Sequence, residues 1–380
     1  MTGPLRVLLS GGGTGGHVYP ALTVVAAAKS AGRNLEFRYV GTRAGLERGI
    51  VAKTTLEFES IDAGAFRGRS PRAVLGSLGH NLRGAVQAFR ILRRYRPDVI
   101  LATGGFVCVP VVMMARLLGV PSVVYLPDLR PGWAVRFLAR FATVVAVSFP
   151  EVVPYVPARR VVVTGYPVRA EIGSCDHLEA RERLRILPDL PVVLVLGGSR
   201  GARSINEAMV AGAAAITSRA FVIHATGPTN FAATKASIER LPAEIGERYR
   251  LDPYLESDLA PALAVASLVV ARAGASVLGE LPAAGVPGVL IPGTFAGGHQ
   301  ALNAEFLADR GAAMIVADAD LTNGALTRAI VDLLDRPEQL RLMAERTLGL
   351  AYPGAARSLC DLIEELACAR RAKADPRRSS

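Results

Sequence analysis

A run of glycines that ends in a histidine is the first feature of the sequence that could do chemistry. The run GGGTGGH, residues 11–17, follows the apolar segment 5–10 and precedes a helix predicted over 18–31. Glycines let the backbone approach a bulky anion, and a helix N-terminus offers free N–H groups. No lysine follows the run, and no acidic residue closes the next strand-like segment, 37–41. The run therefore predicts an anion site that is neither a P-loop nor a dinucleotide fingerprint. A tight turn alone is the simpler alternative.

His17 adds a reactive group to this run. An imidazole takes up a proton near neutral pH, so a histidine at the mouth of a cleft suits the role of general base toward a hydroxyl group. The structural alternative is a helix-start histidine that hydrogen-bonds to the backbone.

A second set of polar residues follows later strand-like segments. Residues 197–202, GGSRGA, form another glycine turn in which Ser199 can donate a hydrogen bond. Residues 272–276, RAGAS, precede a predicted helix that carries Glu280, and residues 297–300, GGHQ, open another helix. Such residues gather at one edge of a parallel sheet. The backbone N–H groups of RAGAS suit a diphosphate and the Glu280 carboxylate suits a ribose diol, whereas the alternative for Glu280 is solvent exposure.

Metal and redox chemistry receive little support. Asp318-Ala319-Asp320 spells the D-x-D of metal-dependent sugar transferases, but it lies between a strand-like segment and a helix, where capping by an aspartate or by Thr322 is the simpler role. The chain's cysteines share no C-x-x-C spacing, which indicates a reducing compartment without a disulfide framework or zinc cluster; they are Cys108, Cys175, Cys360 and Cys368. We predict no metal and no cofactor.

The order of the elements predicts an α/β fold. Apolar runs of strand length alternate with helix-like segments, which is typical of parallel sheets covered by helices. The opening pattern of strand, glycine turn and helix recurs at 191–208, so the chain contains two Rossmann-like domains, with a cleft expected between them. The predicted boundaries are a first Rossmann-like domain over 1–168, a second over 169–352, a helix over 353–369 that packs back on the first domain, and a basic tail over 370–380.

Composition and charge limit the partners. Of the 380 residues 51% are hydrophobic and 20% are charged, which excludes a disordered chain. The net charge of +11 is concentrated in 63–97, which holds eight arginines and no acidic residue, and in the tail. Such a patch indicates an anionic phospholipid surface or nucleic acid, with a solvated helix face as the alternative. Nucleic acid is not expected, because the segment interleaves aliphatic rather than aromatic residues. The start of the chain lacks a signal-peptide pattern, and prolines interrupt the apolar stretch 106–126, which we therefore assign to the core.

Six segments in unbroken order resemble the MurG family of glycosyltransferases. They are GGGTGGHVYPA (11–21), ATGGFVCVP (102–110), GYPVR (165–169), GGSRGARSIN (197–206), RAGASVLGELPAAGVP (272–287) and HQALNA (299–304). The family moves N-acetylglucosamine from UDP-GlcNAc to undecaprenyl-linked lipid I and forms lipid II for peptidoglycan. The resemblance implies a GT-B fold, inversion at the sugar carbon, no metal requirement, and a peripheral position on the cytoplasmic face of the cell membrane. It further implies that the domain over 1–168 serves the acceptor and the membrane and that the domain over 169–352 binds the UDP-sugar. It also implies a role in cell wall biogenesis, cell shape and cell division.

The resemblance also implies roles for single residues. It places His17 toward the acceptor, and it places these residues on the donor: Thr14, Gly15, Gly16, Arg169, Ser199, Leu255, Glu280 and Gln300. Asp128 stands at a substrate-binding position where the family has asparagine, and Tyr166 replaces the asparagine of GNPVR. A sister GT-B transferase with another lipid or glycan acceptor therefore stays open, as does a UDP-GlcNAc epimerase, which would turn over the donor without an acceptor.

Overall fold

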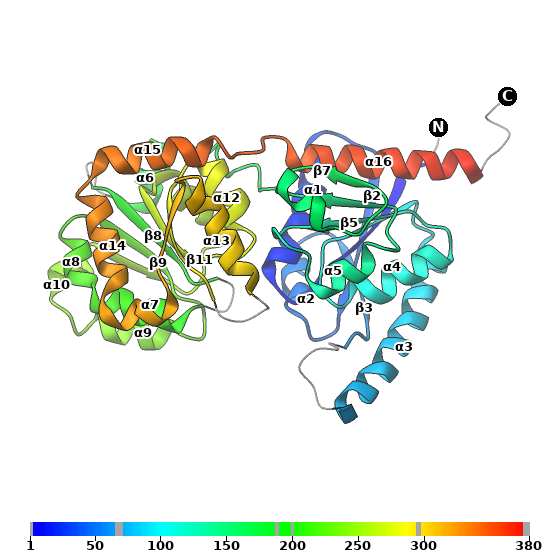
Figure 1. The fold of residues 1–380 in the computed structure, drawn as a ribbon, viewed down its shortest axis with the longest axis horizontal. Coiled ribbons are helices and arrows are strands. Elements are labelled where there is room, and N and C mark those ends of the chain that lie inside the picture. The colour runs from blue at the N-terminus through cyan, green and yellow to red at the C-terminus, as the bar shows by residue number, and fades with distance from the viewer. Residues whose placement is uncertain (1–2, 65–70, 187–189, 199–200, 294–297, 375–380) are drawn as a thin grey trace. The chain divides into compact units, whose positions relative to one another are not determined.

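The computed structural model describes residues 3–64, 71–186, 190–198, 201–293 and 298–374, and in the helix that begins at Pro71 it describes side chains from Leu82 onward. The chain forms two compact units (Figure 1). The first unit contains residues 1–167 and 354–380, and the second contains residues 168–353. Each unit is a parallel sheet with helices, so the predicted α/β fold with two Rossmann-like domains is confirmed.

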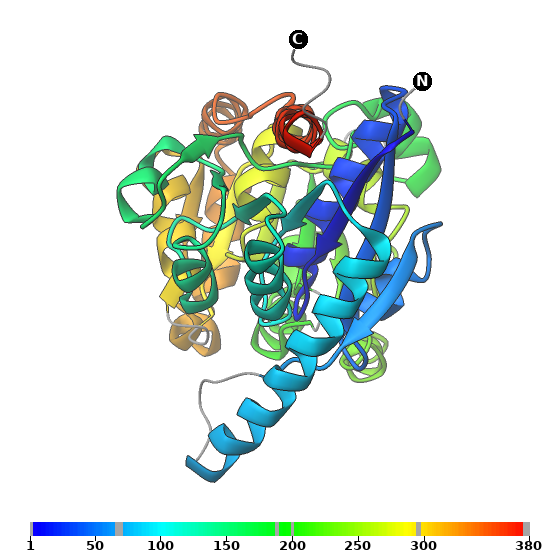
Figure 2. The same ribbon diagram turned by 90° about the vertical axis from the view of Figure 1, so that its right-hand side faces the viewer.

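The first unit is built on a seven-stranded sheet with the strand order β3-β2-β1-β4-β5-β6-β7. Its strands are β1 (Leu5–Ser10), β2 (Leu35–Thr42), β3 (Glu57–Ile61), β4 (Val99–Ala102), β5 (Ser122–Leu126), β6 (Val144–Val147) and β7 (Val161–Val163). Its helices are α1 (Gly15–Ser30), α2 (Leu46–Val51), α3 (Pro71–Tyr95), α4 (Cys108–Leu117), α5 (Trp133–Leu138), η1 (Pro150–Tyr155) and α16 (Ala355–Ala374). The N-terminal part of α3 extends beyond the sheet (Figures 1 and 2).

The second unit is built on a six-stranded sheet with the strand order β10-β9-β8-β11-β12-β13. Its strands are β8 (Val192–Leu196), β9 (Phe221–Ala225), β10 (Tyr249–Asp252), β11 (Leu268–Arg272), β12 (Gly288–Ile291) and β13 (Ala313–Ile315). Its helices are α6 (His177–Leu184), α7 (Arg203–Ala211), α8 (Ala213–Thr217), α9 (Phe231–Ile238), α10 (Ala243–Gly246), α11 (Leu259–Val265), α12 (Val277–Ala284), α13 (His299–Asp309), η3 (Asp318–Asn323), α14 (Ala325–Leu334) and α15 (Pro337–Leu348).

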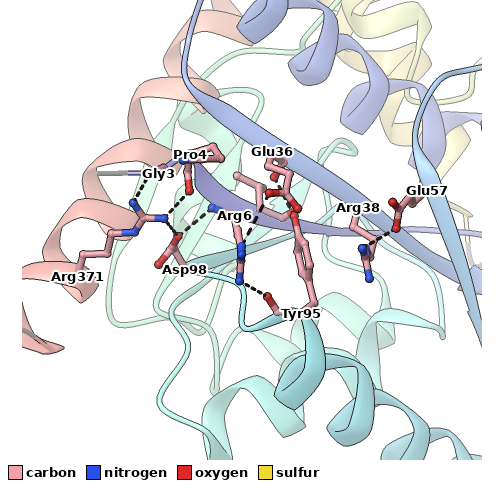
Figure 3. Close-up of polar contacts among 10 residues, drawn as sticks. Gly3, Pro4, Arg6, Glu36, Arg38, Glu57, Tyr95, Asp98 and Arg371 are labelled. Carbon is pink, nitrogen blue, oxygen red and sulfur yellow. Dashed lines mark hydrogen bonds and ion pairs between the residues drawn. The ribbon is translucent and has the colours of Figure 1, made fainter. Parts of the chain in front are cut away.

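The last helix, α16, is part of the first unit. Leu359 and Ile363 are fully buried in the same apolar cluster as Val7 of β1 and Val24 of α1. Near its end, Arg371 donates hydrogen bonds to the carbonyl oxygens of Gly3 and Pro4 and pairs with Asp98 at 2.6 Å (Figure 3). Figure 3 also shows that Arg6 of β1 lies beside this contact, because its backbone N–H donates to the Asp98 carboxylate at 2.8 Å. The two ends of the described chain are thus joined at the start of β1.

The apolar stretch 106–126 forms α4 and β5 and contributes to the core, as the prolines in the sequence indicate. Among the helices that the structure describes, none combines the length and the apolar character that a membrane crossing requires.

Candidate active site

The glycine run of the first unit forms the turn from β1 into α1. It packs against the loop after β4, because the Gly12 N–H donates to the Gly104 carbonyl at 3.1 Å. The Tyr39 hydroxyl of β2 donates to the Gly11 carbonyl at 3.0 Å. A Cβ at Gly105, whose φ is +89°, would lie 2.5 Å from the Gly12 carbonyl oxygen. Contact between the two loops therefore requires a residue without a side chain at this position.

The His17 ring is held by the glycine run itself. Its Nδ1 lies 2.9 Å from the carbonyl oxygen of Gly12 and 3.4 Å from Oγ1 of Thr14. A carbonyl oxygen only accepts hydrogen bonds, so this contact places the proton of the neutral ring on Nδ1 and leaves the Nε2 lone pair free to accept a proton. The predicted alternative, a bond from the histidine to the backbone, is thus present at Nδ1, and it leaves Nε2 fit for general base chemistry.

The second loop shapes the space around the imidazole. Gly104 has a φ of +117°, and a Cβ there would lie 2.7 Å from Cδ2 and 2.9 Å from Nε2 of His17. The ring therefore rests directly on the backbone of Gly104. Thr103, which precedes it, is buried and donates from its hydroxyl to the His17 carbonyl oxygen. Both the ring and the backbone of His17 are positioned by the β4–α4 loop.

The start of α1 presents the other predicted residues of this loop. Thr14 is exposed, with an extended backbone (φ −145°, ψ 157°), and Gly15 and Gly16 form the first turn of the helix. The N–H groups of a first turn have no partner within their own helix. With the Thr14 hydroxyl, they form a donor-rich surface that suits an anion.

Three of the predicted donor residues lie close together in the second unit. Arg169 donates from Nη1 to the carbonyl oxygen of Glu256 at 3.2 Å, next to the buried Leu255. The positive charge of Arg169 also acts on Glu280 of α12. Burial raises the pKa of Glu280, and attraction to Arg169 and a hydrogen bond with Ser276 partly oppose that rise. Glu280 is half-buried, so the alternative of a fully exposed helix carboxylate is wrong.

Gln300 lies in the first turn of α13, after β12, the strand that pairs with β11. Its Oε1 accepts a hydrogen bond from the Gly293 N–H at 2.7 Å. This contact fixes the amide, so its NH₂ group keeps two donors for a ligand. Ser199, the remaining predicted donor residue, lies outside the described residues.

The two departures from the family pattern occupy different environments in the first unit. Asp128 is half-buried just after β5. Tyr166 is buried, and its ring meets the Tyr125 ring edge-on at 6.4 Å between centroids. Tyr125 in turn bonds to the Ser148 hydroxyl at 2.8 Å. Tyr166 thus contributes mainly to packing, whereas Asp128 stands at the end of a strand where substrate residues gather.

Asp318 has a role that its sequence context did not predict. The expected capping role is wrong, because Ala317 occupies the N-cap position of η3 and Asp318 instead pairs with Arg272 at 2.6 Å. The Ser204 hydroxyl donates to the same carboxylate at 2.9 Å, and Arg272 donates to the Ser204 oxygen at 2.8 Å. This triangle ties the end of β11 to the start of α7 and engages the first aspartate of the D-x-D.

The sequence analysis also assigned no role to a buried histidine in β9 of the second unit. His224 of β9 is fully buried, with Nδ1 2.9 Å from the Tyr249 hydroxyl and Nε2 2.9 Å from Oδ1 of Asn206. Asn206 of α7 also donates to the Thr226 carbonyl at 3.0 Å. This network joins α7 to β9 and β10. Burial lowers the pKa of His224 to about 3, so the ring stays neutral in the folded protein.

This pKa predicts a loss of stability in acid. As the pH falls below 6.5, the ordinary value for histidine, the unfolded chain protonates this ring while the folded protein does not until about pH 3. His224 should therefore steepen the fall in the free energy of unfolding by up to about 1.4 kcal/mol per pH unit in that window. Urea unfolding at several pH values should show a shallower pH dependence for His224→Gln than for the native chain. Parallel curves would contradict the prediction.

Two family models match the chain, one in each half of the sequence. The model of the glycosyltransferase family 28 N-terminal domain matches residues 7–147, and that of the C-terminal domain matches residues 192–359.

Relatives and solved structures match nearly the whole chain. A Roseiflexus sp. (strain RS-1) protein is 42% identical over 96% of this chain and 95% of its own, and is named UDP-N-acetylglucosamine–N-acetylmuramyl-(pentapeptide) pyrophosphoryl-undecaprenol N-acetylglucosamine transferase. A Listeria monocytogenes protein of the same name is 36% identical over 94% of this chain and 99% of its own. The Acinetobacter baumannii MurG structure aligns with a TM-score of 0.73 and 28% identity over 95% of this chain and 100% of its own. A UDP-GlcNAc 2-epimerase from Neisseria meningitidis, at 14% identity, a TM-score of 0.63 and coverage of 95% and 100%, shares the fold alone.

Proposed function

This chain belongs to glycosyltransferase family 28, and we propose that it transfers N-acetylglucosamine from UDP-GlcNAc to lipid I, an undecaprenyl diphosphate that carries N-acetylmuramyl pentapeptide. The product is lipid II, the precursor of peptidoglycan. The main support for this proposal is sequence identity: relatives named for this reaction are 35–42% identical to this chain over nearly its full length. This observation favours the reaction over transfer to another acceptor and over epimerisation, and the GT-B fold implied by the sequence agrees with it.

The His17 geometry supports an inverting transfer. The acceptor hydroxyl forms a new bond to C1 of the sugar as the bond from C1 to the diphosphate breaks. The hydroxyl proton passes to Nε2 of His17, and the electron pair of the broken bond leaves with UDP. The charge that develops on the imidazole is stabilised through Nδ1–H by the Gly12 carbonyl, 2.9 Å away. No metal is required for this sequence of bond changes.

The second unit supplies the donor site in this proposal. Glu280 holds the ribose hydroxyls of uridine, and Arg169, Leu255 and Gln300 line the nucleotide-sugar around it. Ser199 and the N–H groups of the glycine turns bind the diphosphate, whose charge increases as UDP leaves. The proximity of Arg169 to Glu280 and the fixed amide of Gln300 support this assignment.

Release of UDP tests the function. UDP should form from UDP-GlcNAc only when a lipid I analogue is present, and His17→Ala should lower turnover by about a hundredfold or more, the usual cost of losing a general base. Calorimetry should show that this variant still binds UDP. Conversion of UDP-GlcNAc without an acceptor would favour an epimerase, and near-normal turnover in His17→Ala would assign the deprotonation to another group.

Glu280 should contribute strongly to nucleotide affinity. Replacing it with alanine should weaken UDP binding by about 1.5–3 kcal/mol, because hydrogen bonds to a charged group are lost. Glu305→Ala removes an exposed carboxylate from α13 in the same unit and is a matched control. Equal affinities of the two variants in calorimetry would show that Glu280 does not hold the ribose.

The membrane surface that carries the acceptor should bind α3. Leu82 and Val86 are 69% and 46% exposed on this helix, and Arg83, Arg90 and Arg93 are exposed beside them. The sequence of this segment also offers Phe66, Leu75 and Leu78 as apolar residues for the same surface, but Phe66 lies outside the described residues and no side chain is described at Leu75 or Leu78. Leu117, 71% exposed at the end of α4, adds an apolar residue on the helix that packs against α3. Apolar residues flanked by arginine suit an anionic lipid surface, and this supports a peripheral position on the cytoplasmic face of the membrane.

Vesicle binding tests this surface. Replacing Arg83, Arg90 and Arg93 with serine should weaken binding to anionic vesicles by about 3 kcal/mol, or roughly a hundredfold, at about 1 kcal/mol per charge. A variant with serine at Arg240, Arg328 and Arg336, all exposed in the second unit, loses the same charge and should bind normally. Added salt should release the native protein. Equal binding to neutral and anionic vesicles would contradict the electrostatic contribution, and tight binding to duplex DNA instead of vesicles would favour nucleic acid.

A further inference from the structure

Glu47 is a fully buried carboxylate beside the glycine run, and the proposed chemistry gives it no role. It lies in the first turn of α2. Its Oε1 accepts hydrogen bonds from the backbone N–H and the hydroxyl of Thr42, at 2.8 and 2.6 Å. Its Oε2 accepts one from the backbone N–H of Gly13 at 3.2 Å. The carboxylate thus connects the β2–α2 loop to the loop that carries His17.

Glycines from both loops leave the space that this carboxylate fills. A Cβ at Gly12 would lie 2.7 Å from Oε1, one at Gly41 would lie 2.6 Å from Cγ, and one at Gly45 would lie 2.2 Å from either oxygen of Glu47. A glutamate that served only as a favourable charge at the start of a helix would be exposed and would need no such space. The packing therefore indicates that these glycines accommodate the Glu47 carboxylate at one defined position between the two loops.

The peptide bond between Gly12 and Gly13 connects Glu47 to the imidazole. Its N–H donates to Oε2 of Glu47, and its carbonyl oxygen accepts the hydrogen bond from Nδ1 of His17. These two groups belong to one rigid plane and point in opposite directions. An anion bound to the N–H of an amide polarises it and makes its carbonyl a stronger acceptor.

We infer that Glu47 is a positioning residue that acts on His17 through the Gly12–Gly13 peptide. It fixes the orientation of this peptide, and the peptide carbonyl then keeps the imidazole proton on Nδ1. Nε2 is thereby held as the proton acceptor toward the sugar hydroxyl. The role resembles that of a carboxylate that orients a catalytic histidine directly, with a peptide group placed between the two. The inference rests on the proposed function only for the use that it assigns to Nε2.

Glu47→Gln separates this role from simple packing. Glutamine has the same size, and its Oε1 can keep both hydrogen bonds from Thr42. Its NH₂ group would then face the Gly13 N–H, donor against donor, so the peptide would lose its anchor. Glu59→Gln is the matched control, because Glu59 lies on β3 of the same unit and pairs with Arg38 and Arg94 instead of the glycine run.

Nitrogen NMR of protein labelled with ¹⁵N-histidine reports the tautomer directly. The chain has five histidines, and the His17 signals are identified by their loss in His17→Ala. The native protein, at a pH where the ring is neutral, should show His17 protonated at Nδ1. Glu47→Gln should shift protonation toward Nε2, lower kcat by about tenfold or more, and leave the KM for UDP-GlcNAc unchanged. Glu59→Gln should match the native protein in all three measurements.

Two results would overturn the inference. One is a native His17 protonated at Nε2, which requires no variant and no acceptor. The other is a folded Glu47→Gln whose tautomer matches that of the native protein, whatever its kcat, since loss of rate alone would indicate a structural role. If Glu47→Gln does not fold, Glu47→Asp applies the same test, because its shorter carboxylate cannot reach Thr42 and Gly13 together. Absence of lipid I turnover in the native protein would reject the proposed function while the NMR result still decides the role of Glu47.

Discussion

Parallel pairing of β1 with β2 on one side and β4 on the other is the constraint on which the first unit depends. Because the three strands run in the same direction, the loops that leave them meet at one edge of the sheet. There the β1 loop carries His17, the β4 loop presses against its ring at Gly104, and the β2 loop leads to Glu47. The β1 loop is held from both sides: it bonds to the β4 loop through Gly12 and Gly104, and to α2 through Gly13 and Glu47.

In both units, hydrogen-bonded polar side chains hold neighbouring segments together; Glu47 and His224 are fully buried, and Asp318 is partly exposed. Glu47 is bound by three donors, Asp318 by Arg272 and Ser204, and His224 by Asn206 and Tyr249. A buried polar group costs free energy unless it is paired, so the networks of Glu47 and His224 strongly favour one arrangement of the segments that they join. Glycine-rich turns have high backbone entropy when unfolded. The hydrogen-bond networks therefore fix backbone that glycine alone would leave free. They hold the glycine run before α1 and the first turn of α7 in place.

Sequence predicted the features that depend on local pattern. The apolar strands, the first glycine turn and the position of His17 at a helix start follow from short motifs, and the structure confirms them. The edge strands β3 and β10 were not predicted from the sequence, because charged residues interrupt their apolar pattern. These residues are Glu57 and Glu59 in β3 and Arg250 in β10. Glu47 was missed because a glutamate in a first helical turn usually faces solvent. The capping role of Asp318 was wrong because its partner, Arg272, lies 46 residues earlier and only the fold brings the two together.

The charges close to His17 explain why a glycine run suits the proposed role of this histidine as a general base better than a P-loop would. A P-loop lysine binds phosphate strongly, but a fixed cation beside the imidazole would oppose the positive charge that arrives with the acceptor proton. Backbone N–H groups attract an anion with only partial charges, so they impose little of this cost. On the side of the Gly12–Gly13 peptide away from the imidazole, the charged group is instead the Glu47 carboxylate, which accepts the hydrogen bond from the Gly13 N–H. In the proposed transfer, this carboxylate favours positive charge on the ring through the peptide, so the same loop could bind an anion and support a base.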